Sequence, residues 1–195
     1  MKRLLMVAAI ATLGAGCDTL SKGPYASTQF VAVNGSGVWG RMTFHQSEGK
    51  TFLGSDIGYS APIAQAMAET TAGKVFVRAD VNGLTPNRVY AITVHERGDC
   101  SANGTKVGGH FNPSSTPHGH YDKPERHAGD LPNLAVNGEG TALLAIQTTA
   151  FTVEPGPRSV VNRAVVIHER PDDFTTQPDG NSGLPIGCGV IRLVD

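Results

Sequence analysis

Five of the seven histidines in this 195-residue chain lie in one stretch that ends in an aspartate. The stretch contains His95, His110, His118, His120, His127 and Asp130. Imidazole is the commonest metal-ligating side chain, and three histidines with one carboxylate make a closed tetrahedral shell for zinc. The stretch therefore predicts a metal site. The alternative is a histidine-rich surface loop that binds no metal.

The elements that position these residues are predicted to be short strands. Eight alternating or β-rich runs are each bounded by Gly, Pro, Asn or Asp, which is typical of an antiparallel all-β sandwich or barrel. They cover residues 30–33, 38–44, 63–69, 74–81, 88–95, 141–146, 163–168 and 186–194. The run at 63–69 has helical propensity as well, and the length of the chain suits one domain with a sizeable core.

Charge and motifs exclude several classes of function. The formal net charge is −1, which favours neither nucleic acid nor an anionic membrane surface as a partner. The sequence also contains no P-loop, dinucleotide-binding fingerprint or basic aromatic stripe.

The N-terminus is predicted to be a targeting segment. Lys2 and Arg3 precede an apolar run at residues 4–13, which is too short to span a bilayer, and small residues then lead to Cys17. This order resembles a bacterial lipoprotein signal, with residues 1–16 removed and Cys17 lipidated; ordinary secretion and an uncleaved anchor are the alternatives. We expect residues 17–28 to be a polar tether, residues 29–195 to be the domain, and the location to be the bacterial periplasm at a membrane.

Six ordered motifs give the chain a family resemblance. They are GLTP (83–86), HERGDC (95–100), GGHFNP (108–113), ERHAGDLPNL (125–134), VVIHERPDD (165–173) and GNSG to CGVI (180–191). Together they closely resemble the copper/zinc superoxide dismutase family over residues 29–195. The resemblance implies an eight-stranded Greek-key β-barrel or sandwich with two long loops, near residues 96–140 and 169–185.

The resemblance also implies the zinc site. Its ligands would be His110, His118, His127 and Asp130, whereas His120 is expected on the loop surface. Asp172 would accept a hydrogen bond from the zinc-bound His118 and, in the family, a second one from a copper-bound imidazole, so that it orients both rings.

Export bears on the remaining cysteines. If Cys17 is lipidated, Cys100 and Cys188 are left as a pair in an oxidising compartment, which favours a disulfide over two free thiols. In the family, the matching cysteines tie the metal-bearing loop to the last strand.

The copper ligands implied by the resemblance are incomplete. His95, His110 and His168 match three of the four copper histidines, but Thr93 stands where the first histidine of the H-x-H pair belongs. Pro185 stands where the family has an arginine that guides superoxide to the copper. A hydroxyl cannot substitute for imidazole on copper, and proline has neither charge nor donor.

These residues lead to three functional hypotheses. We expect a superoxide dismutase-like protein of the cell envelope that keeps zinc but dismutates superoxide weakly or not at all. The alternatives are an active copper/zinc enzyme with a three-histidine copper site and a periplasmic copper-binding protein. The membrane would be reached only through the lipid at Cys17, and the sequence does not decide whether the barrel forms a homodimer.

Overall fold

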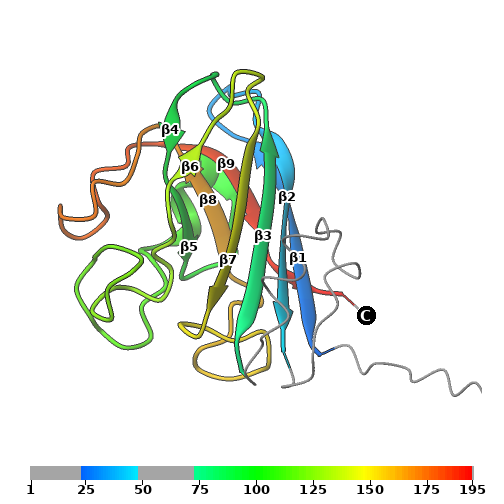
Figure 1. Cartoon of the computed structure of the whole chain (residues 1–195), viewed down its shortest axis with the longest axis vertical. Coiled ribbons are helices and arrows are strands. Elements are labelled where there is room, and N and C mark those ends of the chain that lie inside the picture. Colours follow the sequence, from blue (N-terminus) through cyan, green and yellow to red (C-terminus); the bar gives the residue numbers. More distant parts are fainter. Residues whose placement is uncertain (1–22, 48–72, 195) are drawn as a thin grey trace, which may run out of the picture.

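One curled antiparallel sheet organises the computed structural model, which describes residues 23–47 and 73–194 (Figure 1). The order of neighbouring strands in this sheet is β5-β8-β9-β1-β2-β3-β7, and β10 pairs additionally with β1. β4 and β6 form a separate two-stranded sheet. The strands are β1 (Tyr25–Ala32), β2 (Trp39–Gln46), β3 (Val75–Asn82), β4 (Val89–Tyr90), β5 (Ile92–His95), β6 (Leu134–Ala135), β7 (Ala142–Thr148), β8 (Ala164–His168), β9 (Pro185–Val190) and β10 (Arg192–Leu193). The predicted all-β class is confirmed, and a Greek-key sandwich is consistent with this order.

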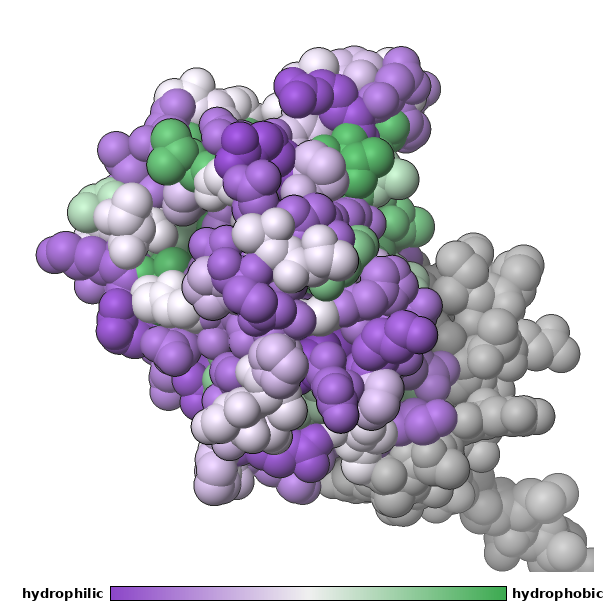
Figure 2. Space-filling view, turned by 90° about the vertical axis from the view of Figure 1, so that its left-hand side faces the viewer, coloured by the Kyte–Doolittle hydropathy of each residue, from purple (hydrophilic) through white to green (hydrophobic). Residues whose placement is uncertain are grey.

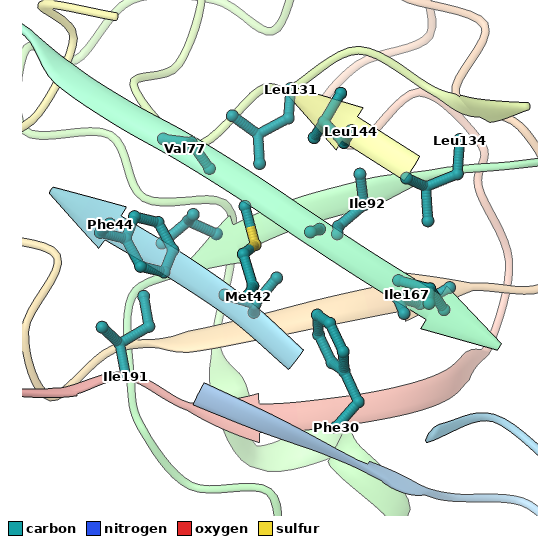
Figure 3. Close-up of a cluster of buried hydrophobic side chains, with 14 of the residues drawn as sticks. Phe30, Met42, Phe44, Val77, Ile92, Leu131, Leu134, Leu144, Ile167 and Ile191 are labelled. Atoms are coloured by element: carbon teal, nitrogen blue, oxygen red, sulfur yellow. The ribbon is translucent and has the colours of Figure 1, made fainter. Parts of the chain in front are cut away.

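The curl of the sheet encloses one main apolar core (Figure 3). On β2, Met42 and Phe44 are both fully buried, and Val77 on β3 lies beside them. Residues two apart on a strand share a face, so these strands direct their apolar side chains inward. The ring of Phe44 meets that of Phe151 edge-on at 6.0 Å, which closes the core from the β7–β8 connection.

The first strand begins earlier than predicted. β1 starts at Tyr25 and pairs with β2 from Tyr25 opposite His45 to Phe30 opposite Gly40. Residues 25–28, which the sequence assigned to a tether, therefore belong to the sheet. These residues, YAST, are mostly polar, so their side chains did not predict a strand. They form one because their backbone pairs with β2 on one side and, at Ala26 and Ser27, with β10 on the other.

Two predicted runs are each divided between sheet partners. Within residues 88–95, β4 pairs with β6 and β5 pairs with β8, and Ala91 between them bonds through its backbone to Arg170 and His168. Within residues 186–194, β9 pairs with β8 and β10 pairs with the start of β1. Which strand a residue pairs with depends on segments far apart in the sequence, so the alternation of apolar residues does not predict a change of partner.

Other predictions have mixed outcomes. The predicted strand at residues 63–69 lies outside the described residues. His45 on β2, a histidine outside the predicted metal site, is buried at 6% exposure with its ring 6.3 Å from that of Tyr25. Among the described residues, no helix is both long and apolar enough to cross a membrane.

Two long connections leave the sheet on one side, and the first of them carries four of the candidate metal-ligating residues (Figure 1). The first runs from β5 to β6 and includes α2 (Ser101–Gly104) and the 3-10 helix η2 (Thr105–Val107); the second runs from β8 to β9. The predicted disulfide is confirmed: Cys100 in the first connection is bonded to Cys188 on β9. A covalent link therefore holds the first connection against the sheet.

Candidate metal centre

Four side chains of the first connection meet around one point. The Oδ1 atom of Asp130 lies 2.8, 3.1 and 3.3 Å from the Nδ1 atoms of His110, His118 and His127, respectively, and all four residues are buried. Ligands about 2.0 Å from a tetrahedral zinc are roughly 3.3 Å apart, so the spacing suits one shared cation. The Nδ1 atoms of His118 and His127 have no hydrogen-bond partner among the described residues, which leaves their lone pairs available.

The charges of this cluster also fit a cation. Burial by itself raises the pKa of Asp130, but the three imidazoles next to its carboxylate, of which His110 donates a hydrogen bond, hold that pKa far below its usual range. Burial lowers the pKa of His118, but Asp130 and Asp172 outweigh it and raise the pKa to about 10. Without a metal the cluster would hold a proton between two carboxylates. A bound dication can replace that proton and leave every ring neutral.

Hydrogen bonds from the loops fix the orientation of these groups. The second oxygen of Asp130 accepts the backbone N–H groups of His127 at 2.9 Å and Gly119 at 3.1 Å. Gln177, from the second connection, accepts from the backbone N–H of His118 and donates to its carbonyl oxygen, at 2.9 and 2.8 Å. The sequence did not predict the role of Gln177, because a contact between two loops far apart in sequence leaves no local pattern.

His110 also belongs to a second cluster, with His95 and His168. His95 Nδ1–H donates to the carbonyl oxygen of Gly108 at 2.9 Å, and His168 Nδ1–H donates to that of Gly183 at 3.0 Å. These bonds fix the tautomer, so that both Nε2 atoms carry lone pairs. They lie 3.2 Å apart. Two lone pairs this close, with the partnerless Nε2 of His110 in the same cluster, make a donor set for a second cation.

Two imidazoles of this cluster, those of His95 and His168, are held neutral. Burial, followed by the proximity of His110 and His168, lowers the pKa of His95 to about 3. Burial is also the main reason that the pKa of His168 is lowered. Neutral imidazole is the form that binds a metal, so these rings are ready to bind without first losing a proton.

Thr93 lies directly beside the second cluster. Alternation along β5 places it on the same face as His95, and its side chain is fully buried. Its hydroxyl oxygen lies 2.8 Å from Nε2 of His95 and 3.2 Å from Nε2 of His168. Because a hydroxyl carries one proton, it can satisfy these two lone pairs only by sharing that proton between them.

Asp172 is hydrogen-bonded to the cluster of His110, His118, His127 and Asp130 (the zinc-type cluster) but to no side chain of the second cluster. Its Oδ1 accepts from His118 Nε2 at 2.9 Å, whereas its buried Oδ2 has no hydrogen-bond partner among the described residues. Asn133 holds its backbone on both sides, donating to the carbonyl oxygen and accepting from the N–H. Gly180 permits this close packing: it has a positive φ, and a Cβ there would lie 1.8 Å from Asp172 Oδ1.

Two further residues singled out from the sequence lie outside both clusters. Pro185 is the first residue of β9 and pairs with His168, and its carbonyl oxygen accepts from Asn34 at 2.8 Å. His120 is exposed, with its ring 4.5 Å from that of Phe174. It contributes to neither cluster.

Comparisons with known proteins agree with this geometry. A family model described as copper/zinc superoxide dismutase matches residues 62–191. A protein named superoxide dismutase [Cu-Zn] 2 from Aquifex aeolicus is 37% identical over 131 residues, covering 65% of this chain and 76% of its own. Another of that name, from Brassica juncea, is 36% identical over 155 residues, covering 75% and 97%. The crystal structure of the clock protein EA4 superposes with a TM-score of 0.70 at 28% identity, covering 89% of this chain and 97% of that one.

Proposed function

The chain belongs to the copper/zinc superoxide dismutase family, and from this premise we propose that it is a zinc-stabilised envelope protein that dismutates superoxide weakly or not at all. The observation that carries the proposal is the Thr93 hydroxyl beside the Nε2 atoms of His95 and His168. A fourth imidazole is expected at this position in an efficient member of the family.

Zinc would be held by His110, His118, His127 and Asp130, and its role would be structural. Four protein ligands leave no open position for substrate. These residues lie along the connection from β5 to β6, so the metal would cross-link distant parts of this long segment. Its binding free energy would then contribute to folding.

Copper bound by His95, His110 and His168 would supply one-electron chemistry. Around it, the chain's own residues offer little support for rapid turnover. The Thr93 hydroxyl competes for the two lone pairs that would bind the metal. Pro185 presents neither charge nor donor where the family has its guiding arginine, and electrostatic guidance of this kind is worth roughly 10- to 1,000-fold in association rate.

The proposal is tested by superoxide decay measured by pulse radiolysis, with the full chain loaded with zinc and copper. We expect a rate at least about 100-fold below that of a family member with four copper histidines, measured in parallel, because loss of even an outer partner of a metal ligand typically costs 10- to 100-fold. Metal content is measured on the same sample. A rate near the diffusion limit would contradict the proposal and establish a three-histidine enzyme. Tight copper binding without turnover would instead indicate copper handling.

We also propose that the protein is lipidated at Cys17 and anchored to a bacterial membrane from the periplasm. The support is the basic, apolar and small-residue order of residues 1–17. Replacing Cys17 with serine is expected to move the protein from the membrane fraction to the soluble fraction or to block processing, as judged by fractionation and mass spectrometry. If the C17S variant fractionates like the wild type and the wild type carries no lipid mass, the anchor does not exist.

A further inference from the structure

A cavity of about 300 Å³ lies outside both metal clusters, where two connections meet. It is lined by Ser114, Thr116, Lys123, Pro124, Arg126, Ala128, Thr149, Ala150 and Arg158. The residues up to Ala128 come from the β5–β6 connection, and the last three come from the β7–β8 connection. In Figure 1 the β5–β6 connection projects to the lower left of the sheet, and the β7–β8 connection lies below the sheet. None of the proposed metal ligands lines the cavity.

The lining is basic and forms no ion pair within the described residues, although Asp130 and Asp122 lie close enough to Arg126 to act on its charge. Lys123, Arg126 and Arg158 supply three positive charges, and the lining includes no carboxylate. Among residues 23–47 and 73–194, none of these three side chains lies within ion-pair distance of an Asp or Glu. Like charges gathered around one hollow repel each other, so an anion in the hollow would be favourable.

Several donors remain available to such an anion. Arg126 uses Nε and Nη1 to bond the carbonyl oxygens of Tyr121, His127 and Asp130, and its guanidinium lies 5.0 Å from the centre of the Tyr121 ring. Its Nη2 has no hydrogen-bond partner in the described part of the chain. Arg158 uses only Nε, toward the Ala150 carbonyl oxygen.

Of the three hydroxyl groups in the lining, one is already hydrogen-bonded and two are not. Thr116 donates its hydroxyl proton to the Arg126 carbonyl oxygen, at 2.5 Å. The hydroxyls of Ser114 and Thr149 form no hydrogen bond within the described ranges, so they can donate to a ligand.

The size and chemistry of the cavity select the kind of anion. Its volume is at the lower end for small-molecule sites, and no aromatic ring lines it, so a nucleobase has no surface on which to stack. Guanidinium and hydroxyl donors match the several oxygens of a phosphate group. The surrounding surface on this side is largely hydrophilic, which suits a small polar ligand (Figure 2).

We propose that this cavity binds a phosphate group through Lys123, Arg126, Arg158 and the neighbouring hydroxyls. The group could be supplied by inorganic phosphate or by the headgroup of an anionic phospholipid. Both present the same oxygen atoms, and the two sources are separated by experiment.

The test is a phosphate titration of the full, zinc-loaded, isotope-labelled chain, followed by NMR. Saturable shifts are expected in the backbone amides of Ser114, Thr149 and Ala150. In the K123Q/R158Q variant the affinity is expected to fall about 10- to 100-fold, since each bond to a charged group is worth roughly tenfold. Arg126 is kept, because its guanidinium also holds the carbonyl oxygens of His127 and Asp130.

The matched control is R41Q/K106Q, which removes the same charge from two exposed residues that do not line the cavity. Unchanged binding in this control supports the proposal. Equal weakening in both variants, or no saturable shift in the wild type, overturns it. The two sources of phosphate are separated by sedimentation of the protein with vesicles of phosphatidylglycerol or of phosphatidylcholine. Cosedimentation with phosphatidylglycerol that is lost only in K123Q/R158Q identifies a lipid phosphate. Saturable shifts with inorganic phosphate, without cosedimentation, identify a free phosphate.

Discussion

Superoxide decay catalysed by the copper- and zinc-loaded chain is expected to accelerate on the order of 100-fold when Thr93 is replaced by histidine. The side chain at position 93 of β5 already lies on the face that carries His95, and the Thr93 hydroxyl oxygen is 3.2 Å from Nε2 of His168. An imidazole there adds a fourth nitrogen to the three of the second cluster. It also removes the hydroxyl that competes for the ring lone pairs.

The same substitution is expected to give the Oδ2 atom of Asp172 a hydrogen-bond donor. Its Oδ2 is buried without a hydrogen-bond partner, while Oδ1 is bonded to His118. An unpaired buried acceptor costs roughly 1–3 kcal/mol, so a ring N–H at position 93 that reaches Oδ2 would recover part of this cost. The Thr93 variant should therefore gain activity without losing the fold.

Thr93→Val is the matched control, because it removes the hydroxyl and keeps the shape of the side chain. Copper affinity, zinc content and thermal unfolding are measured on both variants. A T93H variant that folds, binds both metals and decays superoxide no faster than T93V would contradict the role given to this position. Adding Pro185→Arg to T93H should raise the rate further at low ionic strength, where guidance by charge is strongest.

The Asp130→Ala substitution is expected to abolish zinc binding and to lower the free energy of unfolding by about 3–5 kcal/mol, as the loss of one partner from a buried charged cluster does. Asp130 is completely buried and contacts all three imidazoles of the zinc-type cluster. Its other oxygen holds the backbone of Gly119 and His127. Its removal therefore disrupts the metal shell and the turn that forms it.

Asp122→Ala provides the comparison within the same loop, because the Asp122 side chain is 73% exposed. Zinc content by mass spectrometry and unfolding in denaturant are measured for both variants and the wild type. D122A should match the wild type in both. Full zinc occupancy in D130A would contradict the ligand set proposed for zinc.

The sequence alone determined the all-β class, the disulfide and the residues that gather in the two candidate metal clusters. Turn residues bound each apolar run, and this signal is local, so most strands could be predicted within a few residues. The histidines and aspartates were recognisable because metal chemistry restricts the choice of residue type at a site, and the order of the motifs indicated the family. Thr93 and Pro185 were visible as departures for the same reason.

Only the tertiary structure decided which atoms face one another. The division of residues 88–95 between two partners, the inclusion of residues 25–28 in β1 and the support from Gln177 all depend on pairing between distant segments. The sharing of the Thr93 proton and the unpaired oxygen of Asp172 depend on side chains brought together from different strands and loops. The basic cavity likewise joins two connections that sequence spacing does not relate, because such contacts form only when the sheet curls and its loops pack against each other.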